Sequence, residues 1–177
     1  MGQGDGHMGR DPFFDNAKAI LIVFVVIGHA IELLPSSPVS DFLFLAIYTF
    51  HMPLFIFIAG YFAVRYMDSA DKWKRVRRIL GLYLLSQAFY VVLFRFLGQQ
   101  RLTLAHALIH PCWTTWFLLS LACWLVLLPA FAGRRGALAA SATLALAAGY
   151  ADAVGTALSL SRTIVFLPFF LAGHEAG

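Results

Sequence analysis

Long apolar runs separated by short polar stretches divide the chain into six hydrophobic segments. A bilayer-spanning helix needs about 20 consecutive apolar residues. The first four segments meet that length, the fifth is short and rich in alanine, and the sixth runs into the C-terminus. The pattern predicts an all-α fold, a multi-pass transmembrane helical bundle of about six spans. The expected segments are Phe14–Leu34, Phe42–Val64, Ile79–Leu97, Trp113–Phe131, Ala137–Tyr150 and Thr163–Ala172.

Composition supports a membrane-embedded chain. Hydrophobic residues make up 60% of the 177 residues, charged residues 12%, and the mean hydropathy is +0.78. Soluble domains are nearer half apolar and a quarter charged. The two cysteines, Cys112 and Cys123, have neither CxxC nor metal-ligand spacing. We therefore expect an integral membrane protein with no metal site and no permanently bound cofactor.

Basic residues cluster beside the hydrophobic segments, which argues for topology rather than for a nucleic-acid partner. The stretch Arg65–Arg78 holds six of them, and the positive-inside rule places it in the cytoplasm. Arg134 and Arg135 then fall on the same side. Residues 1–12 become a cytoplasmic tail and residues 13–177 the transmembrane domain. A second interpretation is that the basic stretch binds an anionic donor substrate at the cytoplasmic surface. The six are Arg65, Lys72, Lys74, Arg75, Arg77 and Arg78.

A polar stripe runs along the first segment. On a helix turning about 100° per residue, Asp15, Lys18, His29 and Glu32 fit in a sector of roughly 100°. Ionisable groups in lipid are costly, so an intramembrane one indicates a functional site by default. The stripe predicts a hydrated and chemically active strip of the helix surface, which we call the seam.

Each residue of the stripe also has a purely structural interpretation. His29 is suited to general-base chemistry near neutral pH, but it could instead be hydrogen-bonded packing at a neighbouring helix. Glu32, one turn later, could orient the imidazole, although a place at the outer interface is the favoured interpretation. Lys18 and Asp15 could simply pair at the cytoplasmic end, with Lys18 extending to the interface.

Further histidines lie outside the stripe. His51 precedes Pro53 in the second segment, where a proline favours a kink that frees backbone carbonyls. His51 either faces the same seam as His29, or it is a buried histidine whose ring is hydrogen-bonded within a kinked helix that serves only for packing. His106 and His110 fall in an expected outer loop, Gln99–Cys112. They could contact an acceptor, but plain loop residues are the simpler interpretation.

Four motifs in order resemble the membrane-bound acyltransferase family 3, in particular its fucose 4-O-acetylase-like acetyltransferases. The motifs are FDNAKAILIVFVVIGH, FHMPLFIFIAGYF, WFLLSLACWLVLLP and SRTIVFLPFFLAG. The family's first helix carries a basic residue, ten intervening positions and a histidine, which correspond here to Lys18 and His29. Many members have arginine at the basic position, and lysine lacks its bidentate geometry. Family members are longer, so the chain resembles their N-terminal half.

The resemblance implies an enzyme, namely an O-acyltransferase that lies in the cell membrane with its N-terminus in the cytoplasm. In a bacterium this would be the inner membrane. It implies acetyl transfer from a cytoplasmic acyl-CoA, a co-substrate, to a sugar or other hydroxyl acceptor of the cell envelope. His29 would be catalytic, Lys18 with Asp15 would meet the donor, and His51 and Glu32 would line the substrate cavity. The alternative is a transporter or a non-catalytic membrane subunit that uses the same seam as an ion path.

Overall fold

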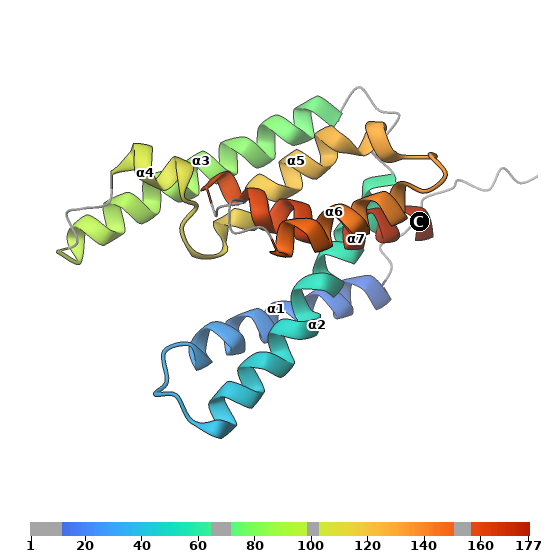
Figure 1. Cartoon of the computed structure of the whole chain (residues 1–177). Helices are drawn as coiled ribbons and strands as arrows, with labels where there is room; N and C mark the ends of the chain where they lie inside the picture. The colour runs from blue at the N-terminus through green and yellow to red at the C-terminus, as the bar shows by residue number, and fades with distance from the viewer. Residues whose placement is uncertain (1–11, 65–71, 99–102, 151–156) are drawn as a thin grey trace, which may run out of the picture. The chain divides into compact units, whose positions relative to one another are not determined.

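The computed structural model describes residues 12–64, 72–98, 103–150 and 157–177, and over these residues the chain is helical without strands. The all-α prediction is therefore confirmed (Figure 1). The expected N-terminal tail lies outside the described residues, apart from Pro12, which begins α1. The helices are α1 (Pro12–Ile31), α2 (Pro38–Ala63), α3 (Lys72–Phe96), α4 (Leu104–Ile109), α5 (Trp116–Phe131), α6 (Ala137–Tyr150) and α7 (Leu160–Ala176). Two short 3-10 turns are η2 (Trp113–Thr115) and η3 (Ala157–Ser159).

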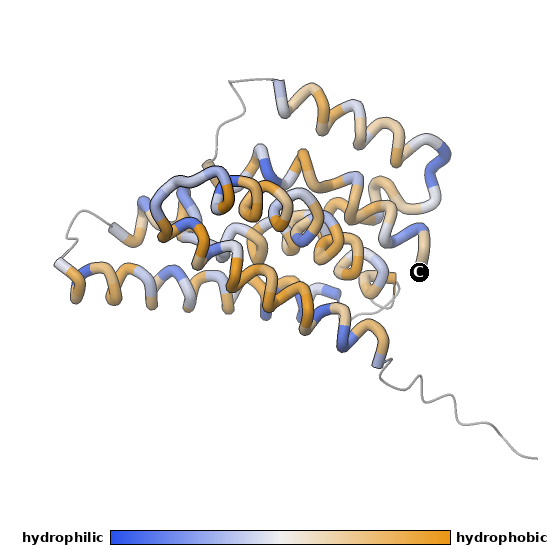
Figure 2. The backbone as a smooth tube through the Cα atoms, turned by 90° about the horizontal axis from the view of Figure 1, so that it is seen from below, coloured by the Kyte–Doolittle hydropathy of each residue, from blue (hydrophilic) through white to orange (hydrophobic). Residues whose placement is uncertain are grey.

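Five helical stretches of the described chain are long and apolar enough to cross a membrane. They are Pro12–Ile31, Pro38–Ala63, Lys72–Phe96, Trp113–Phe131 and Ala157–Ala176. Figure 2 shows hydrophobic residues dominating the helices. Many large apolar side chains are exposed, such as Val26 on α1 and Leu85 on α3, as expected where lipid replaces water. The multi-pass prediction is confirmed, with α6 as a shorter apolar helix of 14 residues.

Element boundaries differ from the sequence-based expectation at several helix ends, and three of the differences change the description of the chain. The last span begins at Ala157 rather than Thr163, which gives it 20 residues. The expected outer loop contains α4. The basic stretch is helical from Lys72 onward, because lysine and arginine are good helix formers once the apolar run that follows anchors the helix. Its first part, residues 65–71, lies outside the described residues.

The chain divides into two compact units, residues 1–58 and residues 59–177. In the first unit, α2 begins with a reciprocal serine cap. The Ser40 backbone N–H donates to Ser37 Oγ at 3.1 Å, and the Ser37 N–H donates to Ser40 Oγ at 2.8 Å. This arrangement resembles a capping box, with Pro38 at the first helical position where it sacrifices no hydrogen bond. The cap fixes where α2 begins and thus which of its side chains share a face.

The second unit has a core formed by α5 and α7. Trp124 and Phe170 are fully buried, with ring centroids 5.4 Å apart. The Trp124 indole Nε1–H donates to the Thr163 carbonyl at 2.8 Å, and the hydroxyls of Ser120 and Thr163 are 2.7 Å apart. These bonds satisfy polar groups that would be costly to leave unpaired in an apolar interior.

Gly60 lets the end of α2 approach α7 closely. A Cβ at this position would lie 2.0 Å from the Phe170 carbonyl oxygen. Any side chain here would force the two backbones apart, so glycine is required by the packing.

Candidate functional site

His29 and Glu32 meet at the end of α1. His29 lies in the last turn, and Glu32 follows the helix at the i+3 position. His29 Nδ1 is 2.9 Å from Glu32 Oε2. The side chains are 27% and 43% exposed, so the pair is accessible rather than sealed in the packing. Of the two roles left open for Glu32, this contact supports the orienting one.

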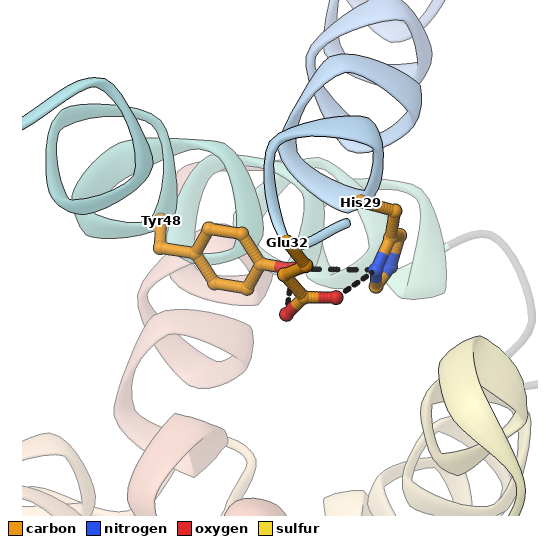
Figure 3. A network of polar contacts seen from close by, with 3 residues as sticks. All are labelled: His29, Glu32 and Tyr48. Carbon is orange, nitrogen blue, oxygen red and sulfur yellow. Dashed lines mark hydrogen bonds and ion pairs between the residues drawn. The ribbon is translucent and has the colours of Figure 1, made fainter. Parts of the chain in front are cut away.

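Tyr48 completes a three-residue network with His29 and Glu32 across the two helices of the first unit. Its hydroxyl donates to Glu32 Oε1 at 2.9 Å and also lies 3.4 Å from His29 Nδ1. Figure 3 shows the carboxylate between the tyrosine hydroxyl of α2 and the imidazole. We call His29, Glu32 and Tyr48 the His29 cluster.

Packing around the Tyr48 ring fixes its position. Phe44 stacks on it, with centroids 4.0 Å apart. Gly28 sits against it on α1, where an added Cβ would lie 3.0 Å from Tyr48 Cε2. The glycine beside His29 therefore lets α2 approach closely enough for Tyr48 to reach Glu32.

His51 lies one turn beyond Tyr48 and touches the same ring. The two centroids are 4.8 Å apart and the rings are nearly perpendicular. His51 is buried, and its Nδ1 lies 2.6 Å from the Ile47 carbonyl oxygen. Because a carbonyl only accepts, Nδ1 carries the proton, and the neutral ring has its lone pair on Nε2. The structure thus links His51 to the His29 cluster through Tyr48. Pro53 lies inside α2, and the expected kink stays a prediction.

Lys18 and Asp15 are not brought to the His29 cluster. Both lie in the first two turns of α1, and a rise of 1.5 Å per residue puts Lys18 roughly 16 Å from His29 along the axis. Lys18 is half-buried and Asp15 is exposed. The predicted stripe is therefore two separate groups on one helix.

The surroundings of Glu32 favour its charged form. Burial by itself raises the pKa of Glu32, but hydrogen bonds from His29 and Tyr48 and the charge of His29 outweigh it. The net result is a pKa below the ordinary glutamate value. A carboxylate that stays ionised can both orient an imidazole and stabilise the imidazolium formed when that ring takes a proton.

Sequence reasoning missed Tyr48. The sequence feature that could have indicated Tyr48 is its spacing from His51. Tyr48 precedes His51 by three residues and so shares a helix face with it. As for bound groups, no cluster of three or more histidine, cysteine or carboxylate side chains that could hold a metal occurs among the described residues.

Comparison with known proteins gives a family match over nearly the whole chain. Residues 11–177 match the model of the acyltransferase family 3, described as an acyltransferase domain. The chain is 47% identical over 62 residues to Nodulation protein NolL of Sinorhizobium fredii, a stretch covering 33% of this chain and 17% of that protein. Nodulation protein NolL of Mesorhizobium japonicum is 47% identical over 60 residues, covering 32% of this chain and 16% of that protein.

No solved structure matches this chain. The family match, however, spans the polar network of the first unit, the helical core of the second and all five helices suited to crossing a membrane. The chain belongs to the acyltransferase 3 family.

Proposed function

We propose that the protein is an integral membrane O-acyltransferase, with acetyl transfer from acyl-CoA to a sugar or other hydroxyl of the cell envelope as its reaction. The observation that supports this most is the His29 cluster, in which a partly exposed imidazole has its Nδ1 held by a carboxylate. Family membership supplies the reaction class. The His29 cluster supplies groups of the type that such a reaction needs.

The chemistry follows from the protonation pattern of the His29 cluster. When Nδ1–H donates to Glu32, the neutral ring carries its lone pair on Nε2. Nε2 takes the proton of the acceptor hydroxyl as its oxygen attacks the thioester carbonyl carbon. The new C–O bond forms and the C–S bond breaks. The imidazolium then returns the proton to the departing thiolate. General-base assistance of this kind contributes about 10²–10⁴ in rate.

Tyr48 and Glu32 are positioning residues in this scheme. The Tyr48 hydroxyl donates to one carboxylate oxygen of Glu32 and leaves the other for the imidazole. Glu32 is thus held by two donors and selects the His29 tautomer with the proton on Nδ1. A fixed tautomer matters because the opposite one would present a proton rather than a lone pair to the acceptor.

Lys18 with Asp15 is proposed to meet the donor from the cytoplasmic side, where the positive-inside rule places the start of α1. An ammonium group binds phosphate as a point charge, and acyl-CoA carries several phosphates. The separation of roughly 16 Å between Lys18 and His29 suits a donor that enters from one side and delivers its acyl group deeper in the membrane. The same proposal includes the orientation of the chain in the bilayer, with its N-terminus in the cytoplasm, and its location in a bacterial inner membrane.

Reconstituted full-length protein separates this function from transport. Acyl-CoA with a hydroxyl acceptor should release free thiol, read with a colorimetric reagent, in proportion to acylated product. Lys18→Arg should retain activity with an altered KM for acyl-CoA, and Lys18→Met should raise that KM at least about tenfold. Solute uptake into liposomes without thiol release would overturn the proposal in favour of a transporter.

A further inference from the structure

The short helix α4 carries two exposed histidines one turn apart, outside the His29 cluster. His106 lies in the helix and His110 is its C-terminal cap residue. Their ring centroids are 4.7 Å apart with an interplanar angle of 32°. Pairs of histidines at i and i+4 lie on one helix face, a spacing that zinc-binding helices use.

The separation of the rings matches that of two imidazoles on one metal ion. A Zn–N bond of about 2.0–2.1 Å puts each ring centroid about 3.2 Å from the metal. Two ligands at an angle of about 90–110° then have centroids about 4.5–5.2 Å apart. The observed 4.7 Å lies within this range. The centroid separation is therefore compatible with both rings binding one ion.

The turn that carries the two rings is held firmly. The His110 N–H donates to the His106 carbonyl at 2.8 Å, and Thr103 caps the first turn by accepting from the His106 N–H. Between the histidines, the Leu108 carbonyl accepts from the Tyr83 hydroxyl of α3 at 2.8 Å. Ala107 is fully buried. The helix is thus docked on its inner side and presents both imidazoles outward, which lowers the entropic cost of binding an ion.

We propose that His106 and His110 form a bidentate site for a divalent transition-metal ion, with Zn²⁺ and Cu²⁺ as the best-fitting ions. Imidazole nitrogen suits these metals, whereas Mg²⁺ and Ca²⁺ prefer oxygen ligands. The remaining positions would be filled by water or by oxygen atoms of a molecule bound at this face. This site is independent of the proposed acyl transfer, and it departs from the expectation that the chain has no metal site.

Cys112 is a poor third ligand. It is half-buried, whereas both histidines are exposed, and the proposed site does not include it. A site with only two protein ligands binds more weakly than a closed structural zinc site, which has four.

Copper binding to the tag-free, full-length protein in lipid nanodiscs tests the proposal, since Cu²⁺ is the tightest-binding divalent ion for nitrogen sites. Electron paramagnetic resonance at neutral pH should show one Cu²⁺ with two imidazole nitrogens. His106→Asn and His110→Asn should each weaken binding at least about tenfold and leave one imidazole nitrogen. His7→Asn, which changes a histidine outside the described residues, is the control and should change nothing.

Both variants replace exposed side chains, so thermal unfolding should stay within the wild-type range and a lost signal would report the site itself. Acyl transfer is not a readout, so failure of the proposed function leaves this test intact. Binding of Cu²⁺ with wild-type affinity and two imidazole nitrogens in either variant would overturn the proposal. So would the absence of a two-nitrogen signal in the wild-type protein.

Discussion

Each compact unit of the molecule contains a cluster of hydrogen-bonded polar side chains, and the two clusters differ in exposure and in chemistry. The His29 cluster in the first unit is partly exposed and contains an imidazole and a carboxylate in contact with each other. The second cluster, Ser120, Trp124 and Thr163, is buried and has none; we call it the Thr163 cluster. Its hydroxyls and indole can hold helices together, but they lack an activating base.

The comparison shows that polar residues in an apolar chain are not equally informative about function. Hydrogen bonds of the Thr163 cluster join α5 to α7, including Trp124 Nε1 to the Thr163 carbonyl. Interhelical bonds of this type stabilise membrane bundles by about 0.6–2 kcal/mol each. The His29 cluster also joins two helices, yet its side chains remain accessible and can exchange protons. Accessibility together with a held tautomer, rather than polarity alone, points to chemistry.

The largest expected effect on stability comes from the second unit. Trp124→Ala removes a fully buried ring stacked on Phe170, and such a truncation costs about 3–5 kcal/mol. The melting temperature in detergent should fall sharply. The contact between Glu32 and His29 should persist at temperatures where the variant is still folded. The imidazole NMR resonances of His29 monitor this contact. An unchanged melting temperature would show that this core is not the stabilising centre.

The next effect distinguishes the clusters by activity. Glu32→Gln keeps the size of the side chain but removes the charge that stabilises an imidazolium. We expect kcat for acyl transfer to fall by about 10–100-fold, or about 1.4–2.7 kcal/mol of transition-state stabilisation. KM for acyl-CoA should stay close to the wild-type value because the proposed donor contact is at Lys18, away from Glu32. A rise in KM with unchanged kcat would instead assign Glu32 to binding.

A smaller effect is expected from Thr163→Val. This change removes the hydroxyl that bonds to Ser120 and to the Ser159 carbonyl. It should lower stability by about 1 kcal/mol, measured as a shift in the thermal transition. Acyl-transfer turnover per folded molecule should not change. Loss of turnover without loss of fold would contradict the structural role of the Thr163 cluster.

The smallest effect concerns pH. In the folded protein the pKa of Glu32 lies below the ordinary glutamate value. The stability that Glu32 contributes is therefore complete above the ordinary glutamate pKa, and it disappears as the pH falls through the lowered pKa of the folded state. The first unit should therefore lose a small part of its hydrogen-exchange protection in acid. Tyr48→Phe, which removes one donor to the carboxylate, should reduce this loss. An identical pH profile in the variant would contradict the contribution of Tyr48.

Much of the fold follows from sequence because apolar runs of bilayer length determine helices in lipid almost by themselves. The structure confirms the helical, multi-pass prediction on this basis. The start of the last span was harder to predict. Residues before Thr163 are mixed in polarity. The continuous helix α7 begins at Leu160, directly after the short turn η3, in which Leu158 and Ser159 have positive φ. The helix α4 is held in place by tertiary contacts such as Tyr83 with Leu108, which no local pattern reveals.

The site was predictable only within one helix. Helical periodicity placed Lys18, His29 and Glu32 on one face, and the contact between His29 and Glu32 follows from their i, i+3 spacing. Tyr48 comes from another helix, and its partners depend on the close approach that Gly28 permits. A pattern along one helix cannot specify such a contact. The interface role favoured for Glu32 stays a prediction, and its contact with Tyr48 is the part that one helix cannot reveal.

The central claim is that the His29 cluster performs the chemistry while the Thr163 cluster supports the fold. Turnover of the full-length protein, measured side by side for His29→Ala and Ser120→Ala at matched amounts of folded protein, tests this claim most directly. We predict that His29→Ala loses about 10²–10⁴-fold in kcat with only a small fall in melting temperature. Ser120→Ala should melt earlier and keep wild-type turnover. Wild-type turnover by His29→Ala would contradict the account.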